Sequence, residues 1–139
     1  MADILLKVDI ITPQSVVFSG EAVSVNVPGS LSPFEVLINH AAIVSSLDSG
    51  VIKIRLKDNS LIYFASGTGF IEVNKNVVSI LVETAVNALE IDKDKVLTAI
   101  DNFKSEITKT TNNTEKIIIA SKLSVEQAKL KAATMLRRN

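Results

Sequence analysis

The chain has 139 residues, a formal net charge of zero, no cysteine, and hydrophobic side chains at 47% of its positions. Zero net charge argues against nucleic acid as a partner of the whole chain. The lack of cysteine excludes disulfides, zinc-thiolate sites and thiol nucleophiles. No run approaches the roughly 18 apolar residues of a membrane-spanning helix. Because the apolar content is high without such a segment, we expect some apolar side chains to be buried against a partner.

Alternating apolar and polar side chains mark the N-terminal part of the chain. In EAVSVNVPG, Val23, Val25 and Val27 alternate with Ser24 and Asn26, the period of two that is typical of a half-buried strand. The same kind of pattern predicts strands in LLKVDII (5–11), VIKIRLKDN (51–59), SLIYFAS (60–66), FIEV (70–73) and VVSILVE (77–83).

Short turn-forming stretches separate these predicted strands. Strands at spacings of about 8 to 12 residues favour an antiparallel β-sandwich or flattened barrel, which we assign to residues 1–86. The predicted turns are Ser19–Gly20, Asp58–Ser60, Gly67–Gly69 and Asn74–Asn76.

The period changes near residue 87, and residues 87–139 are predicted to form an α-helical hairpin. Asp92 is a plausible N-cap of the first helix, and TKTTNNT (108–114) ends it. The second helix runs from about Glu115 to Arg138, with Asn112 and Glu115 placed as a capping box. Apolar side chains of the first helix recur with helical spacing at Val96, Ile100, Phe103 and Ile107.

The second helix is less regular than the first. Three β-branched residues follow one another at Ile117–Ile119, and Ser124 with Gln127 resembles a further capping box. We therefore expect this helix to be broken or only conditionally formed. Residues 1–86 carry 5 basic and 8 acidic side chains, a net charge of −3, whereas 87–139 carry 10 and 7, a net +3. The tail either docks on an acidic surface or is a solvated helix face.

His40 is the only histidine of the chain and the first candidate for chemistry. A lone histidine cannot build a zinc site without further ligands, so no metal or cofactor is expected. A serine hydrolase would need Ser45 or Ser46 and Asp48 beside it, but no nucleophile elbow is present. Gly67–Gly69 fits a tight turn better than a phosphate loop. The residues alone favour a non-catalytic binding or regulatory protein.

Five segments carry a family resemblance over nearly the whole chain: VDIITPQSVVFSGEAVSVNVPGS (8–30), PFEVLINHAAI (33–43), LDSGVIKIRL (47–56), VVSILVETA (77–85) and EIDKDKV (90–96). Together they resemble the epsilon subunits of the F-type rotary ATP synthase, called delta in mitochondria. By this likeness the first segment holds a turn at Phe18 and Gly20, and His40–Ala42 stand for the family's His-Ala-Pro. Glu83–Ala85 match its Glu-Thr-Ala.

The resemblance implies a non-catalytic rotor subunit of the central stalk, with an N-terminal sandwich and a C-terminal helical hairpin. The sandwich of this family binds the gamma subunit and the ring of c subunits. The alternative for the histidine is a purely structural role in its loop. The residues implied at the gamma and c-ring contact are Ser30, Leu31, Ser32, Pro33 and His40.

The hairpin of this family either folds against the sandwich or extends along gamma into the head of alpha and beta subunits, where hydrolysis then stops. Such an element needs two packings that differ by only a few kcal/mol. We therefore expect residues 87–139 to be inhibitory. The residues implied at the contact with beta are Lys122, Lys129, Lys131, Arg137 and Arg138.

An ATP-binding motif of many bacterial relatives, Ile/Leu-Asp-x-x-Arg-Ala, is altered in this chain. Ile91 and Asp92 are kept, but Lys95 and Val96 stand where the family has arginine and alanine. Lysine lacks the planar fork that grips a phosphate. The resemblance implies ATP contacts at Glu83, Ile91, Asp92 and Lys95, but the changes at Lys95 and Val96 argue against ATP as a regulatory ligand.

The N-terminus shows no secretory or import signal, and the resemblance implies a peripheral protein at the cytoplasmic face of the inner (plasma) membrane. The coupling ion, proton or sodium, is decided in other subunits. Two alternatives stay open: a free-standing β-sandwich binding module whose helices are mere packing, and a small hydrolase built on His40 and Asp48.

Overall fold

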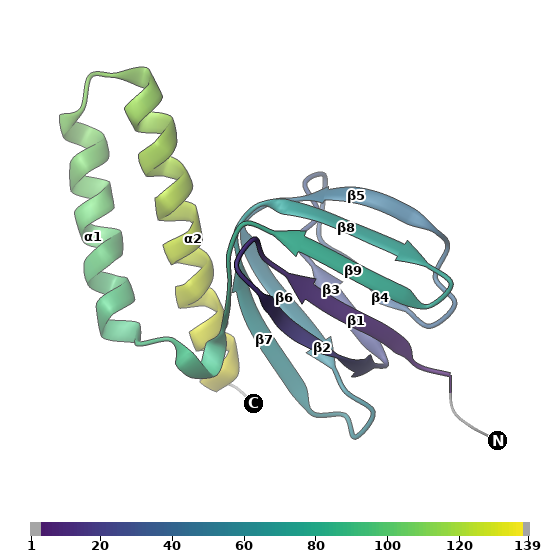
Figure 1. Ribbon diagram of the computed structural model, residues 1–139. Coiled ribbons are helices and arrows are strands. Elements are labelled where there is room, and N and C mark those ends of the chain that lie inside the picture. The colour runs from purple at the N-terminus through teal and green to yellow at the C-terminus, as the bar shows by residue number, and fades with distance from the viewer. Residues whose placement is uncertain (1–3, 138–139) are drawn as a thin grey trace.

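The computed structural model describes residues 4–137, which form a β-rich body with a helical hairpin at one side (Figure 1). The helices are η1 (Ala88–Glu90, a 3-10 turn), α1 (Lys93–Lys109) and α2 (Asn113–Arg137). The strands are β1 (Leu6–Ile11), β2 (Val16–Ala22), β3 (Ser24–Val27), β4 (Phe34–Leu37), β5 (Ile43–Leu47), β6 (Gly50–Arg55), β7 (Leu61–Ser66), β8 (Gly69–Asn74), β9 (Val77–Val82) and β10 (Ala85–Asn87).

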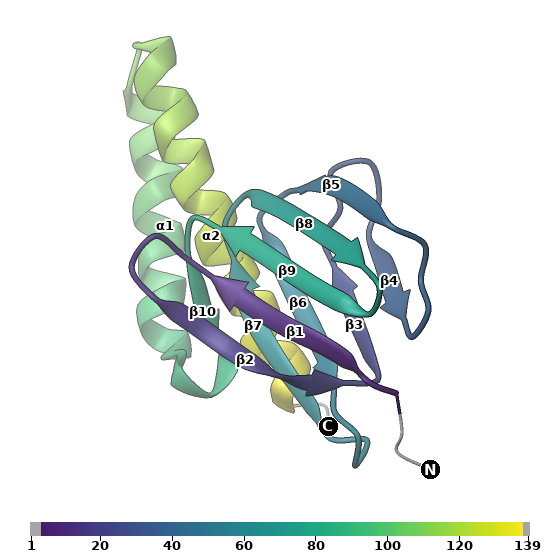
Figure 2. The same cartoon turned by 45° about the vertical axis from the view of Figure 1, so that its right-hand side comes forward.

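The strands form two five-stranded sheets that pack face to face (Figures 1 and 2). One sheet has the order β2-β1-β9-β8-β5 and the other β10-β7-β6-β3-β4. Neighbouring strands run antiparallel except for β1 and β9, which are parallel and join the start of the chain to residues 77–81. The predicted β-sandwich followed by a helical hairpin is confirmed.

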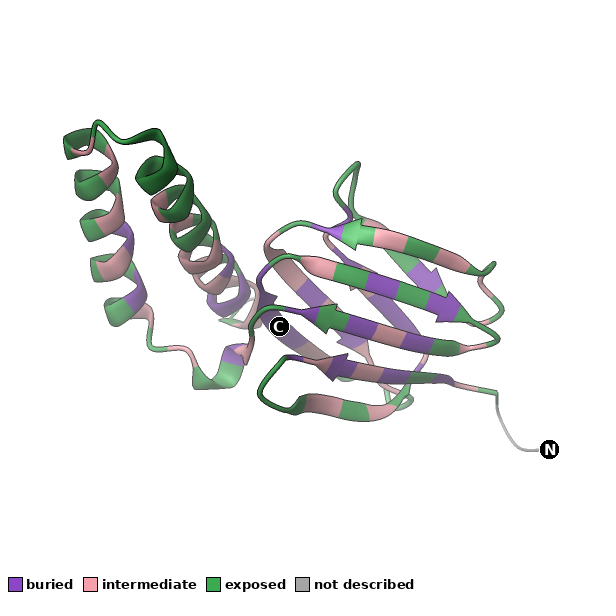
Figure 3. Ribbon diagram, turned by 45° about the horizontal axis from the view of Figure 1, so that its top comes forward, coloured by how far each residue is buried: buried purple, intermediate pink, exposed green. Residues whose placement is uncertain are grey.

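Buried residues alternate with more exposed ones along the strands (Figure 3). Their side chains form the main core between the two sheets. Val25 and Val27 of β3 are buried as the alternation predicts, whereas Val23 precedes the strand and is only half-buried. In β6 the inward residues Ile52 and Ile54 are completely buried. Burial of apolar area at about 25 cal/mol per Å² makes this core the main source of stability.

The turn expected at Ser19 and Gly20 is wrong, because both residues lie within β2. Gly20 pairs with Val8 of β1, and the Phe18 ring on the same face of the strand covers it. A Cβ atom added to Gly20 would lie 3.0 Å from Cζ of that ring. Glycine here makes room for an aromatic side chain inside a strand. The chain instead reverses before Ser15, whose carbonyl accepts a 2.9 Å bond from the Thr12 N–H.

Two of the predicted turns are confirmed and use asparagines in the left-handed region. Lys75 and Asn76 have φ of 51° and 65° and join β8 to β9, as in a two-residue hairpin loop. Asn59, with φ of 70°, lies between Asp58 and Ser60. The Asp58 carboxylate accepts bonds from the Ser60 hydroxyl (2.6 Å) and N–H (2.9 Å), which lower the pKa of Asp58.

The N-terminal signals of both helices act as predicted. The Asp92 carboxylate accepts from the backbone N–H groups of Asp94 and Lys95 and caps α1. The Asn112 side chain accepts a 3.0 Å bond from the Glu115 N–H, which is one half of a capping box. The apolar stripe of α1 is most deeply buried at its start, as Val96 and Ile100 are buried and Phe103 and Ile107 half-buried.

The break expected within the second helix is absent from the described conformation, because α2 is continuous from Asn113 to Arg137. Ile117 and Ile118 are exposed, while Ile119 is half-buried and α1 packs along α2. Tertiary packing of one helix face outweighs the low helix propensity of β-branched residues. Whether α2 forms only conditionally stays a prediction.

The hairpin is attached to the sandwich through the C-terminal half of α2. This half packs on the outer face of β6 and β7, whereas the tip of the hairpin projects away from the sheets (Figure 1). The contact is a small second cluster, distinct from the main core. Its buried members are Tyr63, Ala65, Ala88, Ala128 and Ala132, with Val51, Leu61, Ile91, Met135 and Leu136 at its rim.

Candidate interaction surfaces

The β3–β4 loop holds four of the five residues expected at the c-ring contact. Its base is tied to the end of β5, since the Ser30 N–H donates to the Ser46 carbonyl (3.0 Å) and the Ser30 hydroxyl donates to Asp48 (3.1 Å). A Cβ atom on Gly29 would lie 2.5 Å from the carbonyl oxygen of Ser32, so the loop turns on glycine. Leu31 at the tip is fully exposed. A rigid base thus holds an apolar tip in solvent.

His40 lies in the β4–β5 turn. Its backbone N–H donates to the Leu37 carbonyl (3.1 Å), and its ring Nδ1 contacts the Ala41 carbonyl (2.7 Å). The turn is fixed mainly by Asn39, which has φ of 66° and exchanges two hydrogen bonds with Asn76 of the β8–β9 turn. This turn and the β3–β4 loop are at opposite ends of β4, which spans about 14 Å. The structure therefore does not bring His40 to the loop.

The alternative of a small hydrolase built on His40 and Asp48 is contradicted by the geometry. His40 precedes β5 and Asp48 follows it, so the five residues of the strand separate the two by about 17 Å. Asp48 instead accepts the hydrogen bond from Ser30. A general base and its orienting carboxylate must lie within hydrogen-bond distance, and these two residues cannot.

An apolar row lies on the outer face of the sheet β2-β1-β9-β8-β5 and was not predicted from the sequence. Phe70, Leu81, Ile11 and Val16 lie side by side across β8, β9, β1 and β2. The exposed fraction is 60% for Phe70, 47% for Leu81 and 59% for Val16. The sequence of β9, VVSILV, does carry a signal for this row, because apolar residues occupy positions on both faces of the strand.

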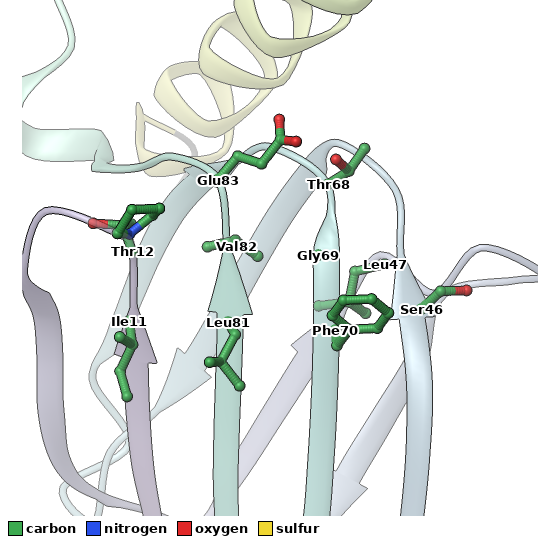
Figure 4. Close-up of a pocket in the computed structure, with 11 residues that line it drawn as sticks. Ile11, Thr12, Ser46, Leu47, Thr68, Gly69, Phe70, Leu81, Val82 and Glu83 are labelled. Atoms are coloured by element: carbon green, nitrogen blue, oxygen red, sulfur yellow. The ribbon is translucent and has the colours of Figure 1, made fainter.

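A hollow of about 680 Å³ adjoins this row at the end of the sheet (Figure 4). Phe70 and Leu81 form its side, and Thr12, Thr68 and Glu83 lie around its rim. Its wall is almost entirely apolar. An apolar, shallow surface rimmed by polar groups is typical of a protein-binding site.

The basic residues of α2 do not form a single cationic face. Lys122 and Lys129 are seven residues apart and so share one side of the helix, and Lys129 is paired with Glu126 at 2.8 Å. Lys131 points instead toward the β3–β4 loop, with which it lines a cleft. Arg137 is exposed in the last turn, and Arg138 lies outside the described residues.

The residues expected to contact ATP are not gathered in one place. Among the residues described, Glu83 alone of the four lines the hollow of about 410 Å³ between the sandwich and the hairpin. Ile91 packs in the second cluster and Asp92 caps α1, while Lys95 is exposed. The lining of the hollow includes two carboxylates, Glu83 and Glu126, and one ammonium group. This charge balance opposes a polyphosphate.

Residues 5–88 match the family model described as the ATP synthase delta/epsilon chain, beta-sandwich domain. The chain belongs to the delta/epsilon family of ATP synthase subunits. An epsilon chain of Sulfurovum sp. is 36% identical over 124 residues, which cover 88% of this chain and 94% of the relative. One from Sulfurimonas denitrificans is 35% identical over 112 residues, 81% of this chain and 86% of the relative.

Solved structures show the same fold at low sequence identity. A chain of the Euglena gracilis mitochondrial ATP synthase, solved as OSCP/F1/c-ring, is 19% identical with a TM-score of 0.81 and covers 94% of this chain and 81% of its own. A chain of the Tetrahymena thermophila mitochondrial enzyme, solved as central stalk/c-ring, is 20% identical with a TM-score of 0.63 and covers 92% and 96%.

Family membership makes the chain a non-catalytic subunit of an F-type ATP synthase. Within residues 4–137, no cluster of three or more His, Cys, Asp or Glu side chains is placed to hold a metal ion. No helix of the same residues is long and apolar enough to cross a membrane.

Proposed function

We propose that the chain is a rotor subunit of the central stalk that couples the catalytic head of an F-type ATP synthase to its c ring. The observation that carries this proposal is the apolar row of Phe70, Leu81, Ile11 and Val16 on a sheet whose other face already packs on the core. A sandwich that needed no partner would present polar side chains there. We assign this row to the gamma subunit.

The β3–β4 loop (Ser30, Leu31, Ser32 and Pro33) is proposed to contact the c ring. Its tied base and exposed tip support this role, because a preorganised loop loses little conformational freedom on binding. His40 is proposed to reach the same ring from the far end of β4, or else to support the β4–β5 turn. The relatives solved with a c ring share this fold.

Residues 87–139 are proposed to form a regulatory unit that inhibits ATP hydrolysis, while residues 1–86 remain bound to the stalk. A hairpin attached through one small cluster, in which the buried residues of α2 are alanines, is suited to release. Once released, the five basic residues of the second helix, Lys122, Lys129, Lys131, Arg137 and Arg138, would contact beta.

The chain is further proposed to act at the cytoplasmic face of the inner (plasma) membrane as a peripheral part of the complex, without ATP as its own ligand. The ion that drives the ring, proton or sodium, is a property of other subunits.

Calorimetry with millimolar ATP tests the proposal that the chain does not bind ATP, and heat of binding would contradict it.

Gel filtration and calorimetry with the gamma subunit of the same organism test the main proposal. We expect a one-to-one complex, weakened at least tenfold by Phe70→Asp. Leu37→Asp is the matched control, because Leu37 is similarly exposed (52%) but lies on the opposite sheet. Absence of any complex with folded gamma would favour the free-standing binding module instead.

A further inference from the structure

The β3–β4 loop and the last turns of α2 face each other across one cleft. Its volume is about 520 Å³, and Ser30–Pro33 line one wall while Lys131 and Met135 line the other. Lys131 and Met135 are four residues apart and therefore share a helix face. The part of the chain proposed to bind the ring and the part proposed to regulate hydrolysis thus form a common surface.

The cleft is lined by two cationic side chains and contains a buried hydrogen-bond acceptor. Lys53 and Lys131 both line it, whereas its carboxylate, Asp48, already accepts a bond from the Ser30 hydroxyl. The Oδ1 atom of Asn26 is buried there and has no hydrogen-bond donor among residues 4–137. A ligand with a carboxylate for the lysines and an N–H group for Asn26 would complement it.

We propose that docked α2 supplies one side of the c-ring binding surface, and that an acidic side chain of the ring lies between Lys53 and Lys131. The proposal rests on the proposed function, since it takes the β3–β4 loop as the ring contact. It adds that the ring binds the sandwich and the hairpin together.

A thermodynamic linkage follows from this shared surface. The docked hairpin raises the affinity of the chain for the ring, so the ring must favour the docked hairpin by the same factor. Release of α2 removes Lys131 and Met135 from the cleft. Lys131 cannot contact the ring and the beta subunit at the same time, so the inhibitory conformation is the one that holds the ring less tightly.

The test uses the full chain in complex with gamma and measures its binding to immobilised, detergent-solubilised c ring. Lys131→Ala removes the exposed ammonium group without touching the second cluster, and we expect about three- to fivefold weaker binding and a shallower salt dependence. Lys116→Ala, an exposed lysine near the other end of α2, is the matched control and should bind as wild type. Leu31→Asp tests the loop itself.

Hydrogen exchange supplies a second measurement on the same complexes. We expect amides of residues 125–137 to exchange more slowly once the ring is bound, because the ring holds α2 in place. If Leu31→Asp weakens binding while Lys131→Ala and the exchange of α2 are unaffected, the shared surface is wrong and the loop contact stands. If no form of the chain binds the ring, both the inference and the proposed ring contact are wrong.

Discussion

The sandwich and the hairpin are held together by cores of very different composition. Between the sheets, large side chains such as Phe64, Ile10 and Ile52 are almost fully buried. Between α2 and the outer face of β6 and β7, the buried residues of the helix are alanines, Ala128 and Ala132, and its larger side chains Met135 and Leu136 are only partly buried. Small side chains bury little area, so the hairpin is attached far more weakly than the sandwich is folded. One chain thereby combines a stable body with an appendage that can separate from it.

The largest expected effect is on the sandwich core. Replacing Ile80, which is completely buried in β9, with alanine should lower the free energy of unfolding by about 2–5 kcal/mol. Urea titration followed by circular dichroism measures this change. Val44→Ala on the exposed side of β5 is the control, and an equal loss in both variants would contradict the role of the buried core as the main source of stability.

The next effect concerns the attachment of the hairpin. Ala132 is fully buried against the sheet, and Ala132→Leu should overpack that contact by about 1–3 kcal/mol and detach α2. Tyr63 is the only tyrosine in a chain without tryptophan, and at 3% exposure it lies in this contact. Its fluorescence should become more accessible to acrylamide while the melting of the sheets is unchanged. Joint unfolding of both parts would show that they are one cooperative unit.

A smaller effect is expected at the start of α1. Asp92→Ala removes the side chain that caps the helix and should cost about 1 kcal/mol. The loss should fall on the hairpin, as faster hydrogen exchange in the first turn of α1. Asp94→Ala, which leaves the cap intact, is the comparison. If exchange in the sheets rises equally, the cap supports more than the hairpin.

The smallest effect is acid dependence at the β6–β7 turn. The Asp58 pKa is lowered from 3.8 by the Ser60 hydroxyl and N–H. A folded-state pKa below the unfolded one gives stability that is complete above pH 3.8 and lost as the pH falls through the folded value. Asp58→Asn should slightly flatten the decline of stability below about pH 4. An unchanged acid titration would mean that these bonds contribute nothing.

The sequence was most informative where one periodicity dominated. Alternation in VIKIRLKDN and the stripe through Val96 and Ile100 predicted a strand and a helix that the structure confirms. Gly20 was misjudged because its use as space for Phe18 depends on a neighbour's side chain. The continuity of α2 depends on α1, which lies beyond any local pattern.

The candidate surfaces were less predictable than the fold. The β3–β4 loop could be named by family resemblance, but its cleft with α2 joins residues about a hundred positions apart. The row through Phe70 and Leu81 requires the register of β8 against β9, since neither segment alone shows which apolar residues face outward. A single sequence does not show which distant segments lie next to each other.

The parallel pairing of β1 with β9 has a consequence for biosynthesis. β1 occupies an interior position between β2 and β9, so it cannot be flanked on both sides until residues 77–82 have left the ribosome. Translation at about 5–20 residues per second makes this a wait of several seconds. During that time β1 can pair only with β2, and its other edge stays unpaired and open to mispairing. The nascent chain is therefore most vulnerable to aggregation before β9 emerges. A chaperone that shields β1 would matter most in this interval.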